Sequence, residues 1–310
     1  MKQITDTLVM IRPVNFRMNE ETAVNNYFQK STEELQANVN KKAQDEFDNF
    51  AELLKSVGVN VIIVDDIAEQ DTPDSIFPNN WVSFHENGDV ALYPMFAKNR
   101  RKERREDIFD KIEGEGRFIR NFVDYTSAEL ENVYLEGTGS LILDRQHQKA
   151  YCALSPRADE DLVIEFCEDF EFTPIIFTAY QSHGGERLPI YHTNVMMCVA
   201  EEFAVICLDT IDDKKERKFV SESLSKDGKE IITISEDQMN SFAGNMLQVQ
   251  GKTDKYLVMS KTAHDSLKPH QIQAIEKHCE ILSSDLSTIE THGGGSARCM
   301  LAEVFIPKVD

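Results

Sequence analysis

The segment THGGGSARCMLAEVFIP (residues 291–307) joins three glycines, an arginine and a cysteine to a lone apolar strand. A second lone apolar strand, TLVMIRPVNF (residues 7–16), lies at the other end of the sequence. If the first strand pairs with the last, the chain closes into a ring. A plainer interpretation of residues 291–307 is a flexible turn followed by an ordinary strand with a buried cysteine.

Between these two strands, four stretches share one layout of strand, polar turn and strand. Their turns include HENGD and QGKTDK, whose Gly, Asn and Asp residues tolerate positive φ and favour hairpins. With the paired terminal strands, these hairpins make five similar units. The four stretches are NWVSFHENGDVALYPM (80–95), GSLILDRQHQKAYCALS (139–155), TNVMMCVAEEFAVICLD (193–209) and NMLQVQGKTDKYLVMS (245–260).

Helical segments are expected between the hairpins. One is KNRRKERREDIFDKI (98–112), whose basic run is expected to be a solvated helix face, and another is KPHQIQAIEKHCEIL (268–282). A long helical region should follow the first strand and end near Gly58. Four apolar residues of the 268–282 segment fall at helical spacing: Ile272, Ile275, Cys279 and Leu282.

The residues that begin the five units recur at nearly equal intervals. They are Asn80, Glu136, His192, Asn245 and Cys299, and the intervals are 56, 56, 53 and 54 residues. A period of this length is typical of a propeller-like repeat. The sequence therefore predicts an α/β fold, a five-bladed β/α propeller in which equivalent positions meet around the axis.

Composition narrows the functional class. The chain has 310 residues, 41% of them hydrophobic, and a formal net charge of −21, which disfavours nucleic-acid and membrane partners. The apolar run at the N-terminus is too short for a signal peptide, and none approaches a transmembrane length. The six cysteines form no CxxC pair, which argues against a zinc or redox motif. We expect a single domain (1–310) located in the cytoplasm. The sequence is compatible with a homodimer.

The predicted convergence brings a nucleophile, a base and a carboxylate together. Cys299 would supply a thiolate, His192 would carry protons, and Glu136 would orient the imidazole. Arg157, between a strand and a helix, would grip a substrate carboxylate through two hydrogen bonds. Taken singly, each residue has a structural alternative. Cys299 could be a core cysteine and His192 a buried histidine whose hydrogen bonds are satisfied. Glu136 could be a turn carboxylate, and Arg157 a solvent-exposed loop arginine.

Five motifs in order along the chain resemble the amidinotransferase and arginine-deiminase superfamily, the pentein enzymes. The resemblance implies that Cys299 is the nucleophile, His192 the general acid and base, and Glu136 its partner. It also implies that Arg157 binds the α-carboxylate and that neither metal nor cofactor takes part. The motifs are FPNNW (77–81), LEGTGS (135–140), SPRAD (155–159), HTN (192–194) and GGGSARCM (293–300).

Two amides mark a departure from this superfamily. Asn80 and Asn194 stand where guanidine-acting members carry aspartates, and Asn245 is a third candidate substrate-binding amide. A guanidinium is a cation that only donates hydrogen bonds, so amides cannot neutralise it, whereas they complement a neutral ureido group. The sequence therefore resembles the citrulline-hydrolysing branch, with ornithine, ammonia and carbon dioxide as products.

Other functions remain open at the level of sequence. Within enzymes, the alternatives are an arginine deiminase, a dimethylarginine-type guanidine hydrolase and an amidinotransferase. Outside enzymes, the superfamily includes a ribosome-binding factor that needs no nucleophile. The joint placement of Glu136, His192 and Cys299 favours catalysis on a small amino-acid substrate.

Overall fold

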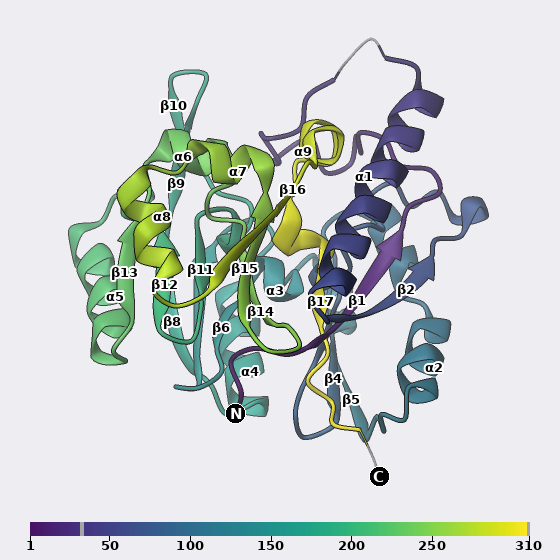
Figure 1. Cartoon of the computed structure of the whole chain (residues 1–310), viewed down its shortest axis with the longest axis horizontal. Helices are drawn as coiled ribbons and strands as arrows, with labels where there is room; N and C mark the ends of the chain where they lie inside the picture. Colours follow the sequence, from purple (N-terminus) through teal and green to yellow (C-terminus); the bar gives the residue numbers. More distant parts are fainter. Residues whose placement is uncertain (32–33, 309–310) are drawn as a thin grey trace.

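A computed structural model describes residues 1–31 and 34–308 of the chain (Figure 1). In this part of the chain the strands form five three-stranded sheets and one separate hairpin. The hairpin, β9 (Tyr180–His183) and β10 (Glu186–Pro189), projects from the body of the molecule (Figure 1). The five sheets, in strand order, are β17 (Ala302–Glu303), β1 (Thr7–Arg12) and β2 (Asn60–Asp65); β3 (Val82–Phe84), β4 (Asp89–Leu92) and β5 (Asn121–Asp124); β6 (Ile142–Asp144), β7 (Lys149–Leu154) and β8 (Thr173–Thr178); β11 (Met197–Val199), β12 (Phe203–Ile206) and β13 (Glu230–Thr233); and β14 (Leu247–Gln250), β15 (Lys255–Ser260) and β16 (Glu280–Ser284).

All five sheets have the same topology. The middle strand pairs antiparallel with the short first strand and parallel with the third. A parallel pair needs a crossover, and each crossover here is helical. The crossover helices are α1 (Gln36–Ser56), α2 (Glu106–Gly114), α4 (Glu160–Asp169), α5 (Lys214–Lys226), and α7 (Lys261–Ser266) with α8 (Pro269–Glu276). The remaining helices are α3 (Gly137–Ser140), α6 (Glu236–Asn240), α9 (Ser287–Gly293), η1 (Ala68–Gln70), η2 (Pro78–Asn80), η3 (Asn99–Glu103), η4 (Thr126–Glu131), η5 (Thr193–Val195), η6 (Leu208–Thr210) and η7 (Ala297–Met300).

The strand predictions are confirmed. All four hairpins form, and the first strand pairs with the last, with Leu8 opposite Glu303 and Val9 opposite Ala302. Two chain segments separated by nearly the whole sequence therefore share one sheet. In the described part of the chain, no helix combines the length and apolar character needed to cross a bilayer.

Two helix predictions are wrong in their bounds. The segment 98–112 divides into η3 and α2. The segment 268–282 ends as a helix at Glu276, so Cys279 lies beyond it and Leu282 belongs to β16. Leu282 pairs with Val258 of β15, and these ladder hydrogen bonds to a neighbouring strand outweigh a helical spacing that is only local.

Helix α1 packs an apolar stripe against the first sheet (Figure 1). Its buried residues recur at helical spacing, and they join the core that also contains Cys299. Val57 follows the helix, and Gly58 has φ of +91°, a left-handed conformation that suits glycine at a helix end. The buried residues of α1 are Val39, Ala43, Phe47, Phe50, Ala51 and Leu54.

Phe50→Ala should destabilise the fold by about 3–5 kcal/mol, because it removes a fully buried ring and leaves a cavity. Urea denaturation measures this loss. Glu52→Ala, on the exposed face of the same helix, should cost less than about 0.5 kcal/mol. Similar losses in both variants would contradict the assignment of the buried face.

Candidate active site

Four short helices lead directly into the first strands of their sheets. η2, α3, η5 and η7 each end within two residues of such a strand. α3 contacts both η2 and η5, and η2 contacts η7. These contacts bring the chain segments that precede four different sheets into one region.

The predicted residues converge, but they do not occupy one equivalent position. Asn80 and Asn245 each lie two residues before a first strand, and Cys299 lies three residues before one. His192 and Glu136 lie five and six residues before theirs. The expectation of a common register is therefore wrong. The nearly equal intervals reflect the common length of the five repeated units. The turn before the first strand differs from one unit to the next, so a different position of each unit lies in the shared region.

Glu136 and His192 form a buried pair. Glu136 Oε2 lies 2.7 Å from His192 Nε2, and Glu136 Oε1 accepts a hydrogen bond of 3.0 Å from the backbone N–H of Phe96. Arg157 Nη1 lies 3.4 Å from Glu136 Oε2, and Arg100 Nη1 lies 4.0 Å from it. Burial raises the pKa of Glu136, but Arg157, His192 and Arg100 outweigh burial and hold the pKa at about 2. Glu136 is therefore ionised.

His192 is held as a neutral imidazole. Burial lowers its pKa to about 4, although Glu136 acts in the opposite direction. Because Nε2 contacts Glu136, Nδ1 is the nitrogen left for chemistry. It faces Gly139, where an added β carbon would lie 2.8 Å from Nδ1. A neutral imidazole at this position can accept a proton and later release it.

Two amide groups hold the sulfur of Cys299. Asn194 Nδ2 and Asn245 Nδ2 each lie 3.2 Å from Cys299 Sγ. Asn245 Oδ1 accepts hydrogen bonds from the backbone N–H groups of Arg298 and Cys299, at 3.0 and 3.4 Å. Both amide N–H groups are therefore directed at the sulfur atom. Asn245, predicted to bind substrate, thus lies against the sulfur of Cys299 and bonds to the backbone of the turn that carries it.

The other five cysteines lie in different surroundings. Burial raises the pKa of each of their thiols, which keeps them protonated. They are therefore unsuited to nucleophilic chemistry. These cysteines are Cys152, Cys167, Cys198, Cys207 and Cys279.

Four predicted residues line one small cavity of about 10 Å³: Asn80, Arg157, His192 and Cys299. Glu136, Asn194 and Asn245 are not among the lining residues, and they contact those that are. No hydrogen bond joins His192 to Cys299 among the residues that the structure describes. The other lining residues are Asn26, Asp74, Phe77, Arg100, Tyr191, Gly293 and Gly295.

Arg157 is already engaged. Its Nη2 donates to the carbonyl oxygen of Thr22 at 3.0 Å, and its Nε donates to Asn25 Oδ1 at 2.9 Å. Together with Glu136, these groups occupy the guanidinium from several sides. The segment that contains Thr22 and Asn25 therefore covers the predicted carboxylate-binding arginine.

Two charged residues of the cavity were not predicted from the sequence. Asp74 is 2% exposed, and its Oδ2 accepts hydrogen bonds from Asn19 and Thr22, while its Oδ1 has no partner. Arg100 is also 2% exposed and belongs to the basic run that was expected to be solvated. That expectation is wrong for Arg100. The position of Asp74, three residues before the FPNNW motif, was the signal that could have identified it.

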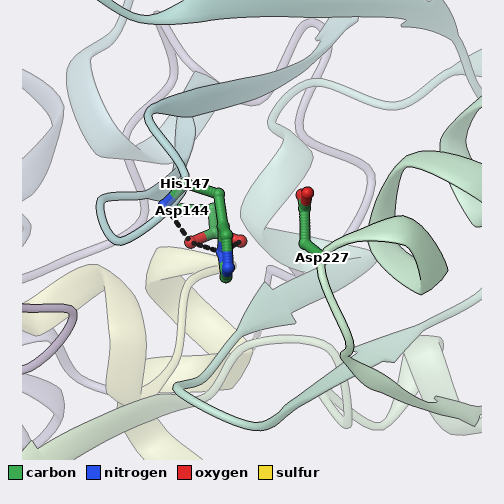
Figure 2. Close-up of side chains that lie close together, drawn as sticks. All are labelled: Asp144, His147 and Asp227. Carbon is green, nitrogen blue, oxygen red and sulfur yellow. Dashed lines mark hydrogen bonds and ion pairs between the residues drawn. The ribbon is translucent and has the colours of Figure 1, made fainter.

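One cluster in the described part of the chain brings three possible metal ligands together (Figure 2): Asp144, His147 and Asp227. Both Asp144 oxygens lie 3.0 Å from His147 Nδ1. Lys229 Nζ lies 3.3 Å from Asp144, and Lys149 Nζ lies 2.6 Å from Asp227. Because each carboxylate already has an ammonium partner, the cluster is balanced without a metal ion.

Residues 12–306 match the model of a family described as N,N dimethylarginine dimethylhydrolase, eukaryotic. The chain belongs to this family. None of the curated proteins matches the sequence. Family membership confirms the superfamily resemblance. The description of this family is that of a hydrolase and not of a ribosome-binding factor.

Solved structures share the fold. The arginine dihydrolase ArgZ of cyanobacteria matches with a TM-score of 0.74 at 15% identity, over 98% of this chain and 41% of ArgZ. AgrE in complex with L-arginine gives 0.75 at 16% identity, over 98% of this chain and 41% of AgrE. A dimethylarginine dimethylaminohydrolase adduct with S-methyl-L-thiocitrulline gives 0.64 at 13%, over 97% and 99%. The chain thus spans about two fifths of the length of ArgZ and AgrE.

Acid should destabilise the fold through His192. Its pKa is about 4 when folded and 6.5 as the ordinary value. Between these values the unfolded state binds more protons, so the unfolding free energy falls as pH falls. From pH 7 to pH 5 we expect His192 to contribute roughly 1–2 kcal/mol of this loss. Urea denaturation at both pH values should show the loss in the wild type and a smaller one in His192→Gln. Equal losses would contradict a neutral buried imidazole.

Asn245→Ala should slow alkylation of Cys299 by iodoacetamide at pH 7. Loss of one hydrogen bond to sulfur, worth roughly 1 kcal/mol, predicts a decrease of about fivefold. Mass spectrometry of the labelled peptide measures the rate. Asn240→Ala, an exposed asparagine, is the matched control and should leave the rate unchanged. An unchanged rate in Asn245→Ala would show that its amide does not activate the thiol.

Proposed function

We propose that the chain hydrolyses the ureido group of citrulline, giving ornithine, ammonia and carbon dioxide. The observation that carries this proposal is the pair of amides, Asn80 and Asn194, beside Cys299 and His192. Asn194 Nδ2 contacts the sulfur, and its buried Oδ1 has no partner. That oxygen is suited to accept a hydrogen bond from a ureido N–H.

The proposed mechanism has two stages. Substrate binding lets the thiol proton of Cys299 pass to Nδ1 of neutral His192, and the thiolate attacks the ureido carbon. As the bond from carbon to the terminal nitrogen breaks, His192 returns the proton and ammonia leaves. A carbamoyl thioester remains on Cys299. Glu136 stays ionised and stabilises the imidazolium that forms between these steps.

Water then completes the reaction. His192 takes a proton from water, the hydroxide attacks the thioester carbon, and the carbon–sulfur bond breaks. The thiolate recovers its proton from His192, and an N-carboxylated amine is released. That carbamate separates into ornithine and carbon dioxide, so one water is consumed for each citrulline.

Arg157 and Asp74 are suited to the amino-acid end of the substrate. The Arg157 guanidinium can form two hydrogen bonds to an α-carboxylate, and the free Oδ1 of Asp74 can accept one from an α-ammonium group. The cavity holds about one water molecule, so substrate binding requires the segment with Thr22, Asn25 and Asn26 to move. We propose that the substrate carboxylate then replaces Asn25 on Arg157.

Arginine is a second candidate substrate. If Asp74 contacted a cationic guanidinium instead of an α-ammonium group, its carboxylate would compensate that charge, and the structural neighbour ArgZ is named an arginine dihydrolase. The two candidates are compatible. Hydrolysis of one guanidino carbon–nitrogen bond of arginine yields a ureido group, and hydrolysis of that group yields ornithine.

We also infer that the five sheets close into a five-bladed propeller that serves as one catalytic domain (1–310). Contacts between neighbouring first strands support this closure: β17 contacts β3, and β11 contacts both β6 and β14. The candidate active site then lies at the end of the axis, where η2, α3, η5 and η7 gather.

The proposed function predicts ornithine formation from citrulline. Purified protein is incubated separately with citrulline, arginine and dimethylarginine, and ornithine, ammonia and citrulline are measured. Ornithine and ammonia should form from citrulline in equal amounts in the wild type. Cys299→Ala should fold and form neither. Turnover of arginine or dimethylarginine to citrulline, with no ornithine from any substrate, would replace this proposal with guanidine hydrolysis.

A further inference from the structure

A second cavity, of about 500 Å³, is bordered by the same segment that covers the candidate active site. Asn26 lines the small active-site cavity, whereas Tyr27, Phe28 and Lys30 line this larger one. The other walls come from β9, α7 and α9 and from the loop that follows α6. Among the described residues, none lines both cavities. The volume falls within the range of roughly 300–1,000 Å³ that small-molecule sites occupy.

Glu290 of α9 gives this cavity a buried carboxylate that lacks a counter-charge. It is 5% exposed, and its Oε1 accepts a hydrogen bond of 2.6 Å from Ser296 Oγ. The hydroxyl groups of Ser260 and Thr262 also hydrogen-bond to it, but burial outweighs these bonds and raises the pKa of the carboxyl group. No basic side chain in the described part of the chain forms an ion pair with Glu290. A buried carboxylate held only by neutral groups favours a bound cation.

Gln181 of β9 gives the same cavity a donor without an acceptor. Its side chain is 2% exposed, and its Nε2 has no hydrogen-bond partner among the described residues. A buried N–H group without an acceptor is unfavourable, so a ligand oxygen at this position would be stabilising. Lys30, exposed on the same lining, favours an oxygen that carries negative charge. The buried rings of Phe28 and Phe242, with centroids 5.2 Å apart, add an apolar surface.

We propose that this cavity is a second binding site, for a small aliphatic zwitterion with an ammonium group at one end and a carboxylate at the other. The ammonium group pairs with Glu290, the carboxylate accepts a hydrogen bond from Gln181, and the methylene chain packs on Phe28 and Phe242. Hydrogen bonds in which one partner is charged are the strong ones. Each end of the ligand thus satisfies a group that the folded chain leaves uncompensated. This site does not depend on the proposed function, because no residue of the small cavity takes part in it.

The position of the second site links it to the nucleophile. A ligand there contacts Tyr27 of the covering segment, whose ring stacks on His183 of the β9–β10 hairpin with centroids 4.9 Å apart. On the opposite wall it contacts Glu290, which holds Ser296, and the carbonyl oxygen of Ser296 accepts a hydrogen bond of 3.1 Å from the backbone N–H of Cys299. An occupied site therefore ties the covering segment to the body of the molecule and opposes the movement that exposes Cys299.

Calorimetry with 5-aminopentanoate tests the binding site. Cys299 is first alkylated with iodoacetamide, so that the added group fills the small cavity. The alkylated protein should still bind one 5-aminopentanoate per chain with a Kd below about 1 mM. Pentanoate and pentylamine, which each lack one charged end, should bind at least about tenfold more weakly. Absence of binding in this range, or equal affinity for all three compounds, would overturn the proposal.

Two variants place the ligand in the cavity. Gln181→Leu removes the free donor, and Glu290→Gln removes the charge but keeps an acceptor for Ser296. Each should weaken binding of 5-aminopentanoate at least about tenfold. Glu276→Gln, on the exposed side of α8, is the matched control and should bind as the wild type does. Wild-type affinity in both cavity variants would show that the compound binds elsewhere.

The reactivity of Cys299 tests the link between the two cavities without any turnover. Saturating 5-aminopentanoate should slow alkylation of Cys299 by iodoacetamide at least about threefold in the unmodified wild type. The same concentration should not slow it in Gln181→Leu. Protection that persists in this variant would place the compound in the small cavity and overturn the link, as would an unchanged rate in the wild type. If Glu290→Gln does not fold, Gln181→Leu decides both tests alone.

Discussion

The buried carboxylate of Glu136 is the constraint on which the site depends. Its side chain is fully buried, and an ionised group there is tolerated only with partners. Those partners come from distant parts of the chain: His192, Arg157, Arg100 and the backbone of Phe96. The interactions that compensate this one carboxylate thus fix the positions of His192 and of both cavity arginines.

This network also explains why the site is compact. Arg157 and Arg100 compensate Glu136 and, at the same time, contact groups that line or cover the cavity. Arg157 contacts the covering segment through Thr22 and Asn25, and Arg100 contacts Asn80. The lining of the cavity and the compensation of the Glu136 charge therefore share the same side chains, so that a substitution at either arginine affects both.

Much of the fold could be predicted from local pattern. The four hairpins follow from pairs of apolar segments separated by short polar turns, two of which contain glycine. The pairing of β1 with β17 follows because each is a single apolar strand in the sequence without a hairpin partner of its own. The end of helix α8 could not be predicted, because Leu282 satisfies helical spacing but pairs with β15. Within the site, the intervals singled out Cys299, His192 and Glu136, but these residues lie three, five and six residues before their first strands, so the equal spacing does not explain why they come together. The burial of Arg100 could not be predicted, because a run of basic residues does not indicate which of them will be buried beside carboxylates.

The pairing of β1 with β17 has a consequence for biosynthesis. Cys299 lies in η7, immediately before β17, and every other residue of the site precedes it in the chain. During translation β1 has no β17 to pair with until this last strand emerges, so the network around Glu136 can assemble before Cys299 arrives. An incomplete nascent chain would therefore hold a pocket without its proposed nucleophile, and a chain released by a ribosome that stalls before residue 299 would be inert under the proposed mechanism.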